Sequence, residues 1–73
     1  MITTIRISTY TLPAHVAIHP ILVKSHVVKR RWNFLCFYCV IRTRKGKETV
    51  EALQKALDDA GIYHHHYEIK VDE

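Results

Sequence analysis

The longest apolar stretch of the chain, residues 32–41, reads WNFLCFYCVI and has basic residues on both sides. It is rich in aromatic and β-branched residues, which favour strands, and it lacks the 3.6-residue apolar stripe of an amphipathic helix. It is also far shorter than the roughly 20 apolar residues that cross a bilayer. The pattern therefore predicts either a strand that is buried on both faces or the central strand of a small sheet.

Two β-branched segments precede this stretch. Residues 2–12 alternate loosely between apolar and polar side chains and predict a strand that ends at Pro13. Residues 15–28 are again β-branched and apolar, so they predict a second strand, with a bend or a sheet edge at Pro20. We expect the two to form an antiparallel hairpin. Residues 29–31 then form either the turn into the central strand or the solvent-exposed part of one long bent ribbon.

In the second half of the chain, the spacing of the apolar residues changes from that of a strand to that of a helix and back again. Residues 47–60 predict a helix, because apolar side chains recur there at the spacing of one helical face and Gly61 follows as a C-cap. Residues 62–71 return to strand-like alternation. The predicted class is thus α+β, a single domain over residues 1–73 with the order β-β-β-α-β and one helix packed on one face of the sheet. We expect the other face to expose aromatic side chains.

The length of the chain and its net charge limit the classes of partner that we expect. A chain of 73 residues buries only about 60% of its unfolded surface, so we expect a partner or a second copy to add stability. The formal net charge of +4 favours acidic partners such as nucleic acid or an acidic protein face. Residues 1–13 lack the pattern of a secretory signal, and no apolar run spans a membrane. We therefore expect a cytoplasmic protein with no membrane partner.

The cysteines and histidines raise the question of a metal. Cys36 and Cys39 point to opposite faces of a strand, so we expect buried thiols and no disulfide between them. In a strand, His64 and His66 converge on one face and form a patch whose charge grows below about pH 6.5. A crossover through the helix makes the last two strands parallel, which places these histidines near residues 29–31. No ligand spacing supports a full metal site, so we expect neither a metal nor a cofactor.

Basic residues flank the central strand and are the candidate binding residues for nucleic acid or an acidic partner. A merely solvated basic surface is the alternative interpretation. Four aromatic residues, Trp32, Phe34, Phe37 and Tyr38, either stack on bases or fill the core. The chain has no glycine-rich phosphate loop, nucleophile elbow or HExxH motif, so we expect no enzymatic activity. The candidate binding residues are Lys29, Arg30, Arg31, Trp32, Arg42, Arg44, Lys45 and Lys47.

Three functional hypotheses follow from these features. The first is a small non-enzymatic protein that docks on a larger protein or nucleoprotein assembly of a host or partner. In overall plan, and at no specific residue, the chain resembles the small proteins that phages and mobile elements encode to inhibit host machinery, anti-CRISPR proteins among them. The second is a basic RNA- or DNA-binding module. The third is a structural homo-oligomer, with a homodimer as its simplest form.

Overall fold

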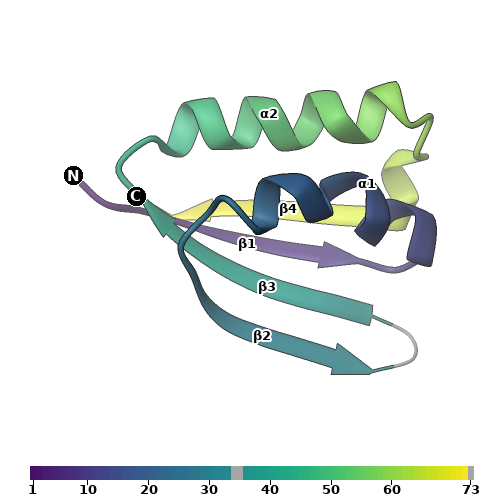
Figure 1. Ribbon diagram of the computed structural model, residues 1–73, viewed down its shortest axis with the longest axis horizontal. Helices are drawn as coiled ribbons and strands as arrows, with labels where there is room; N and C mark the ends of the chain where they lie inside the picture. The colour runs from purple at the N-terminus through teal and green to yellow at the C-terminus, as the bar shows by residue number, and fades with distance from the viewer. Residues whose placement is uncertain (34–35, 73) are drawn as a thin grey trace.

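The computed structural model describes residues 1–33 and 36–72. Over these residues the chain forms two α-helices and four strands, arranged as in Figure 1, and the α+β class is confirmed. The predicted order β-β-β-α-β with one helix is wrong, because the second predicted strand is mostly a helix. The elements are β1 (Thr3–Thr9), α1 (Leu12–Leu22), β2 (Val27–Asn33), β3 (Cys36–Thr43), α2 (Gly46–Asp59), the 3₁₀ turn η1 (His64–His66) and β4 (Tyr67–Asp72).

The helix α1 forms where a strand was predicted, and its capping explains why. The Thr11 hydroxyl accepts a hydrogen bond from the Ala14 amide at 3.3 Å, and Pro13 lies in the first turn, where no amide partner is needed. Ala14, Ile18 and Leu22 recur four residues apart and are all buried. Pro20 lies on the exposed side of α1 and has no amide to donate to the carbonyl of Val16, so the helix forms there with one hydrogen bond fewer.

The four strands form one sheet in the order β2-β3-β1-β4, and every neighbouring pair is antiparallel. The strands β3 and β4 run in the same direction, as a crossover through α2 requires, but β1 lies between them. Together with the element order, this is the split β-α-β arrangement of ferredoxin-like folds. Residues 29–31, predicted as a turn, lie instead within the edge strand β2.

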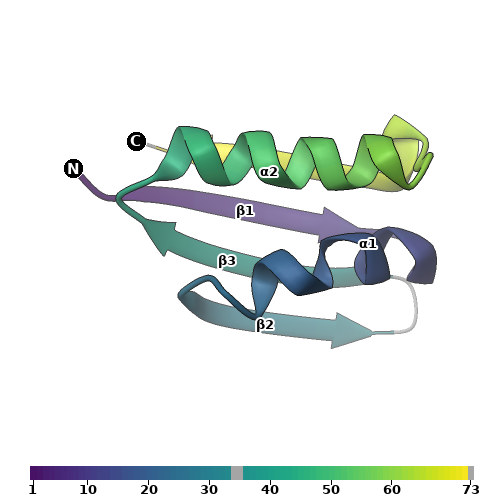
Figure 2. The same cartoon turned by 45° about the horizontal axis from the view of Figure 1, so that its top comes forward.

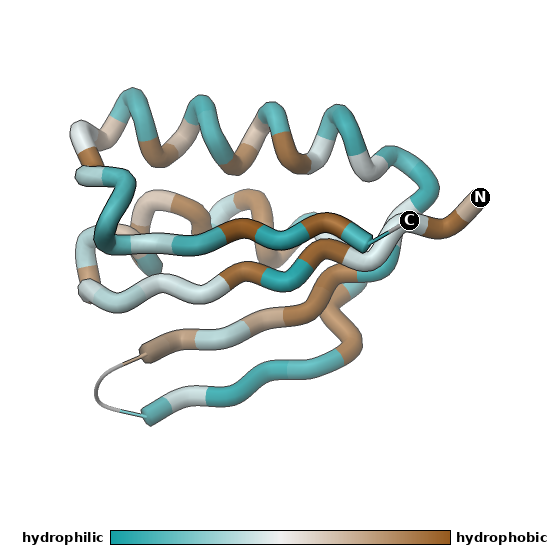
Figure 3. Tube along the Cα trace, turned by 180° about the vertical axis from the view of Figure 1, so that it is seen from behind, coloured by the Kyte–Doolittle hydropathy of each residue, from teal (hydrophilic) through white to brown (hydrophobic). Residues whose placement is uncertain are grey.

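Both helices lie on the same side of the sheet, as Figure 2 shows. They pack against each other and against β1. The core between these layers contains Ile5 and Ile7 of β1, Ile41 of β3 and Leu53 and Leu57 of α2. Figure 3 shows the alternation of apolar and polar residues along α2 that this packing requires. The single hydrophobic layer leaves the other face of the sheet without a helix.

The segment before β4 also differs from its prediction. The histidine run forms the turn η1, and strand pairing begins only at Tyr67. As a result Tyr63 and His65 are exposed, whereas Tyr67 and Ile69 pack against the core. Over residues 1–33 and 36–72, no helix combines the length and the apolar character needed to cross a membrane.

Candidate functional site

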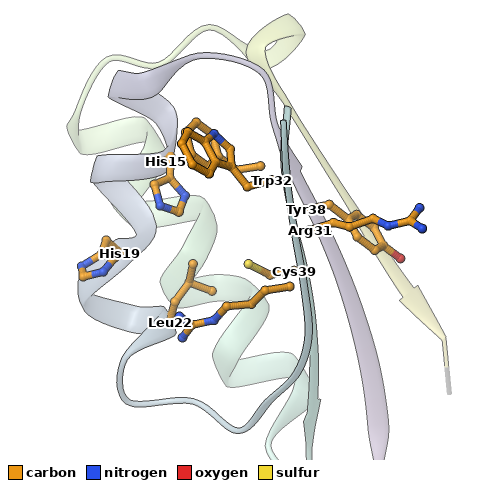
Figure 4. Close-up of a pocket in the computed structure, with 9 residues that line it drawn as sticks. His15, His19, Leu22, Arg31, Trp32, Tyr38 and Cys39 are labelled. Carbon is orange, nitrogen blue, oxygen red and sulfur yellow. The ribbon is translucent and has the colours of Figure 1, made fainter. Parts of the chain in front are cut away.

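The sheet face opposite the helices, here called the open face, is defined by strand register. Ile5 and Ile7 point to the helices, so the residues between them, and the residues paired with those, point the other way. Figure 4 agrees, because Arg31 and Tyr38 point away from α1. The open face includes Lys29 and Arg31 of β2, Cys36, Tyr38, Val40 and Arg42 of β3, Thr4, Arg6 and Ser8 of β1, and Glu68, Lys70 and Asp72 of β4.

Charge on the open face is divided between its two halves. On the half formed by β1 and β4, Arg6 pairs with Asp72 at 2.7 Å and Lys70 pairs with Glu68 at 3.2 Å. On the half formed by β2 and β3, Lys29, Arg31 and Arg42 make no ion pair with any described residue. Uncompensated positive charge is therefore concentrated over β2 and β3.

Tyr38 lies on this positive half, with Lys29 and Arg42 further along the sheet on the side of Val40. Its cross-strand partners are Arg31 of β2 and Ser8 of β1, and its side chain is half-buried. Its neighbour along the face, Val40, is only 8% exposed, although it lies outside the core, because Arg6 and Lys29 flank it. The open face is thus basic with one aromatic ring among the described residues, rather than the broad aromatic surface expected from the sequence.

The other aromatic candidates lie elsewhere. Trp32 and Phe37 are paired across β2 and β3 on the helix side, where their rings stack at 5.8 Å. Phe34 lies outside the described residues.

The remaining basic candidates do not belong to the open face. Arg30 points to the helix side, like Trp32, because it pairs with Cys39. Arg44 and Lys45 lie between β3 and α2, and Lys47 lies in the first turn of α2. These three are exposed at the end of the sheet away from Trp32. The candidate binding residues are therefore distributed over the open face, the helix side and the end of the sheet, and Arg42 of the open face lines one pocket with Arg44 of the end.

The histidine patch is separate from all of these. His64 and His66 lie in η1, next to the edge strand β4, while residues 29–31 lie on the other edge strand. With β3 and β1 in between, roughly 14 Å separates the two edges, so the two groups that we expected to lie together are apart. The three histidine rings gather around Tyr63 at 4.6–6.0 Å. Within the described part of the chain, no group of three His, Cys, Asp or Glu residues is placed to hold a metal.

A pocket of about 230 Å³, here called the α1–β2 pocket, lies on the helix side. This pocket was not predicted from the sequence, because one of its sides is formed by the unpredicted helix α1. The spacing of His15 and His19, four residues apart, was the available signal, since it places both on one face of a helix. The side chains around it come from α1 (His15, His19, Leu22), β2 (Arg30, Trp32) and β3 (Phe37, Cys39) (Figure 4).

Burial and charge shift two groups in this pocket. The pKa of His15 is lowered, chiefly by burial and further by the nearby positive charges of His19 and Arg30. The pKa of the Cys39 thiol is raised by burial, and Arg30 opposes this shift only partly. At neutral pH, therefore, His15 is neutral and Cys39 is a protonated thiol.

Compared with known proteins, the chain matches no family model, no curated protein and no solved structure. Function is therefore inferred from the geometry and charge of the open face and the α1–β2 pocket.

Proposed function

We propose that this protein is a non-catalytic module that binds single-stranded nucleic acid across the β2–β3 half of the open face. One observation carries the proposal: Lys29, Arg31 and Arg42, without ion pairs among the described residues, share one face of an uncovered antiparallel sheet with Tyr38, and Arg31 is its direct cross-strand neighbour. Nucleic-acid-binding sheets combine these two features, cations for the phosphates and an aromatic ring on which a base stacks.

The dimensions of this surface suit a short single strand. Same-face residues in a strand are roughly 7 Å apart, so Lys29 and Arg31 can contact successive phosphates. Arg42 lies two such steps along β3 from Tyr38, roughly 13 Å away. Three cations spread over this length hold a few nucleotides, and Tyr38 contributes about 1–3 kcal/mol by stacking on one base.

Two matched triple variants test the proposal. One replaces Lys29, Arg31 and Arg42 with Gln, and the other replaces Lys45, Lys47 and Lys55, which are exposed at the start of α2 and along it, with Gln. Both remove three positive charges, but only the first changes the open face. Affinity for a fluorescently labelled oligouridine is measured by anisotropy from about 50 to about 200 mM salt.

Three neutralised phosphates give a slope of log affinity against log salt of about −2, so the unmodified chain loses about 20-fold in affinity over this range. The open-face variant should lose both the affinity and the salt dependence, while the control variant should keep both. Equal losses in the two variants would mean that net charge, rather than the open face, attracts the nucleic acid, and the proposal would be wrong.

Docking on a protein assembly of a host or partner is the competing proposal, and one observation favours it. Trp32 is 74% exposed on the edge strand β2, and exposed tryptophans often anchor protein interfaces. A homodimer formed through the same edge is the simplest case. These proposals predict no affinity for the oligonucleotide and, for the homodimer, a doubled mass in light scattering that Trp32→Ala returns to the monomer value.

A further inference from the structure

The α1–β2 pocket has an unbalanced set of polar groups. His15, His19 and Arg30 all carry or can acquire positive charge, and no Asp or Glu among the described residues lines the pocket. Arg30 and His19 are close enough to disfavour protonation of His15. The Nδ1 atom of His15 is buried and has no hydrogen-bond partner among the described residues. An anion placed here would relieve the electrostatic repulsion among these groups and would give the Nδ1 atom of His15, when it carries a proton, a hydrogen-bond acceptor.

The same pocket has a flat apolar wall. The Phe37 ring stacks on His15 at 4.2 Å with an angle of 11° and on Trp32 at 5.8 Å with an angle of 9°. Leu22 and Cys39 are buried next to it. Because the Cys39 thiol stays protonated, it acts as an apolar surface rather than as a metal ligand. A ring can therefore pack against this wall while its charged group meets the basic side chains.

The volume limits the size of the ligand. At about 230 Å³ the pocket is smaller than the range of about 300–1,000 Å³ that is typical for drug-sized ligands. A ligand with one ring and one acidic group suits a pocket of this volume.

We propose that the α1–β2 pocket binds a small aromatic anion, a single ring bearing a phosphate or carboxylate, with the acidic group at Arg30 and the two histidines. The guanidinium of Arg30 can bind such a group through two parallel hydrogen bonds. This site lies on the opposite side of the sheet from the open face, so the inference does not depend on the proposed binding of nucleic acid.

The chain contains a single tryptophan, Trp32, and its fluorescence therefore reports directly on the pocket. Four probes are titrated: phenyl phosphate, benzoate, inorganic phosphate and phenol. We expect phenyl phosphate and benzoate, or one of them, to change the emission saturably. Inorganic phosphate and phenol should bind at least about tenfold more weakly, because each lacks either the ring or the charge. The better of the two aromatic anions shows which acidic group the site prefers.

The variant Arg30→Gln should lower the affinity for the preferred probe by at least about tenfold. Arg44→Gln is the matched control, because it removes the same charge from an exposed arginine outside the pocket and should leave the affinity unchanged. Far-UV circular dichroism verifies that both variants are folded. Amide chemical shifts provide a second readout, in which Leu22 and Cys39 should move on binding and Lys70, on the far edge, should not.

Three results would overturn the inference. The first is an absence of saturable binding by either aromatic anion, judged by both fluorescence and chemical shifts. The second is equal affinity for inorganic phosphate and phenyl phosphate, because the aromatic wall would then contribute nothing. The third is an equal effect of Arg30→Gln and Arg44→Gln, because binding would then reflect net charge alone.

Discussion

The start of α2 is fixed on the sheet by a close approach that leaves no room for a side chain. A Cβ atom at Gly46 would lie 2.6 Å from Cβ of Thr3 and 2.7 Å from its Cγ2 and Oγ1 atoms. The clash with Cβ of Thr3 does not depend on the side-chain rotamer, so the backbone must shift. Thr3 is buried and paired with Thr43, which resists that shift.

The variant Gly46→Ala should therefore destabilise the protein. Overpacking of this kind costs about 1–3 kcal/mol, and the better helix propensity of alanine offsets less than about 1 kcal/mol at a helix start. We expect a net loss of about 1–2 kcal/mol in the free energy of unfolding, measured by urea denaturation with an unchanged m-value.

A double-mutant cycle identifies the cause of that loss. Thr3→Gly removes the clashing Cβ atom, so Gly46→Ala should cost clearly less in the Thr3→Gly background than in the unmodified chain. Thr3→Ala keeps Cβ and is the control that should not rescue. If Gly46→Ala changes stability by less than about 0.5 kcal/mol, α2 does not begin on β1 as described.

Three further predictions concern α1 and the pocket. Thr11→Ala should lower stability by about 0.5–2 kcal/mol in thermal unfolding, because it removes the N-cap; an unchanged melting temperature would argue against this cap. The lowered pKa of His15 means that the unfolded chain binds this proton more readily, so stability should fall as pH drops through about 6.5 and below. His15→Gln should flatten that part of the pH profile, and an equally steep profile in the variant would contradict the assignment. The raised pKa of Cys39 and its burial predict slow alkylation at neutral pH relative to the more exposed Cys36, whereas equal rates would contradict the burial.

Strong periodicity in the sequence predicted much of the fold. The strand β1 falls within the predicted strand 2–12, β3 overlaps the predicted strand 32–41 and ends two residues beyond it, β4 covers the last part of the predicted strand 62–71, and α2 matches the predicted helix closely. The segment of α1 was predicted wrongly because its β-branched residues favour a strand, and Pro20 suggested a bend. The decisive signal was local: Thr11 followed by Pro13 is a helix start, which was interpreted only as a strand end.

Because α1 was not predicted, the two faces of the sheet could not be assigned correctly from the sequence either. Because α1 carries the chain back across the sheet, residues 29–31 belong to a strand instead of a turn. A bulge between Val27 and Lys29 then determines which side chains share a face. It directs Arg31 to the open face and Arg30 to the pocket, although the two are adjacent in sequence. A shift by one residue exchanges these faces, and nothing in the sequence pattern fixes the bulge.

The most direct test of the central claim is a chemical-shift titration of the isotope-labelled chain with an unlabelled oligouridine. The account predicts that the largest amide shifts occur in β2 and β3, around Arg31, Tyr38 and Arg42, with small changes in α2 and η1. Shifts confined to α2 or η1, or no shifts where the unmodified chain should be saturated, would contradict binding at the open face.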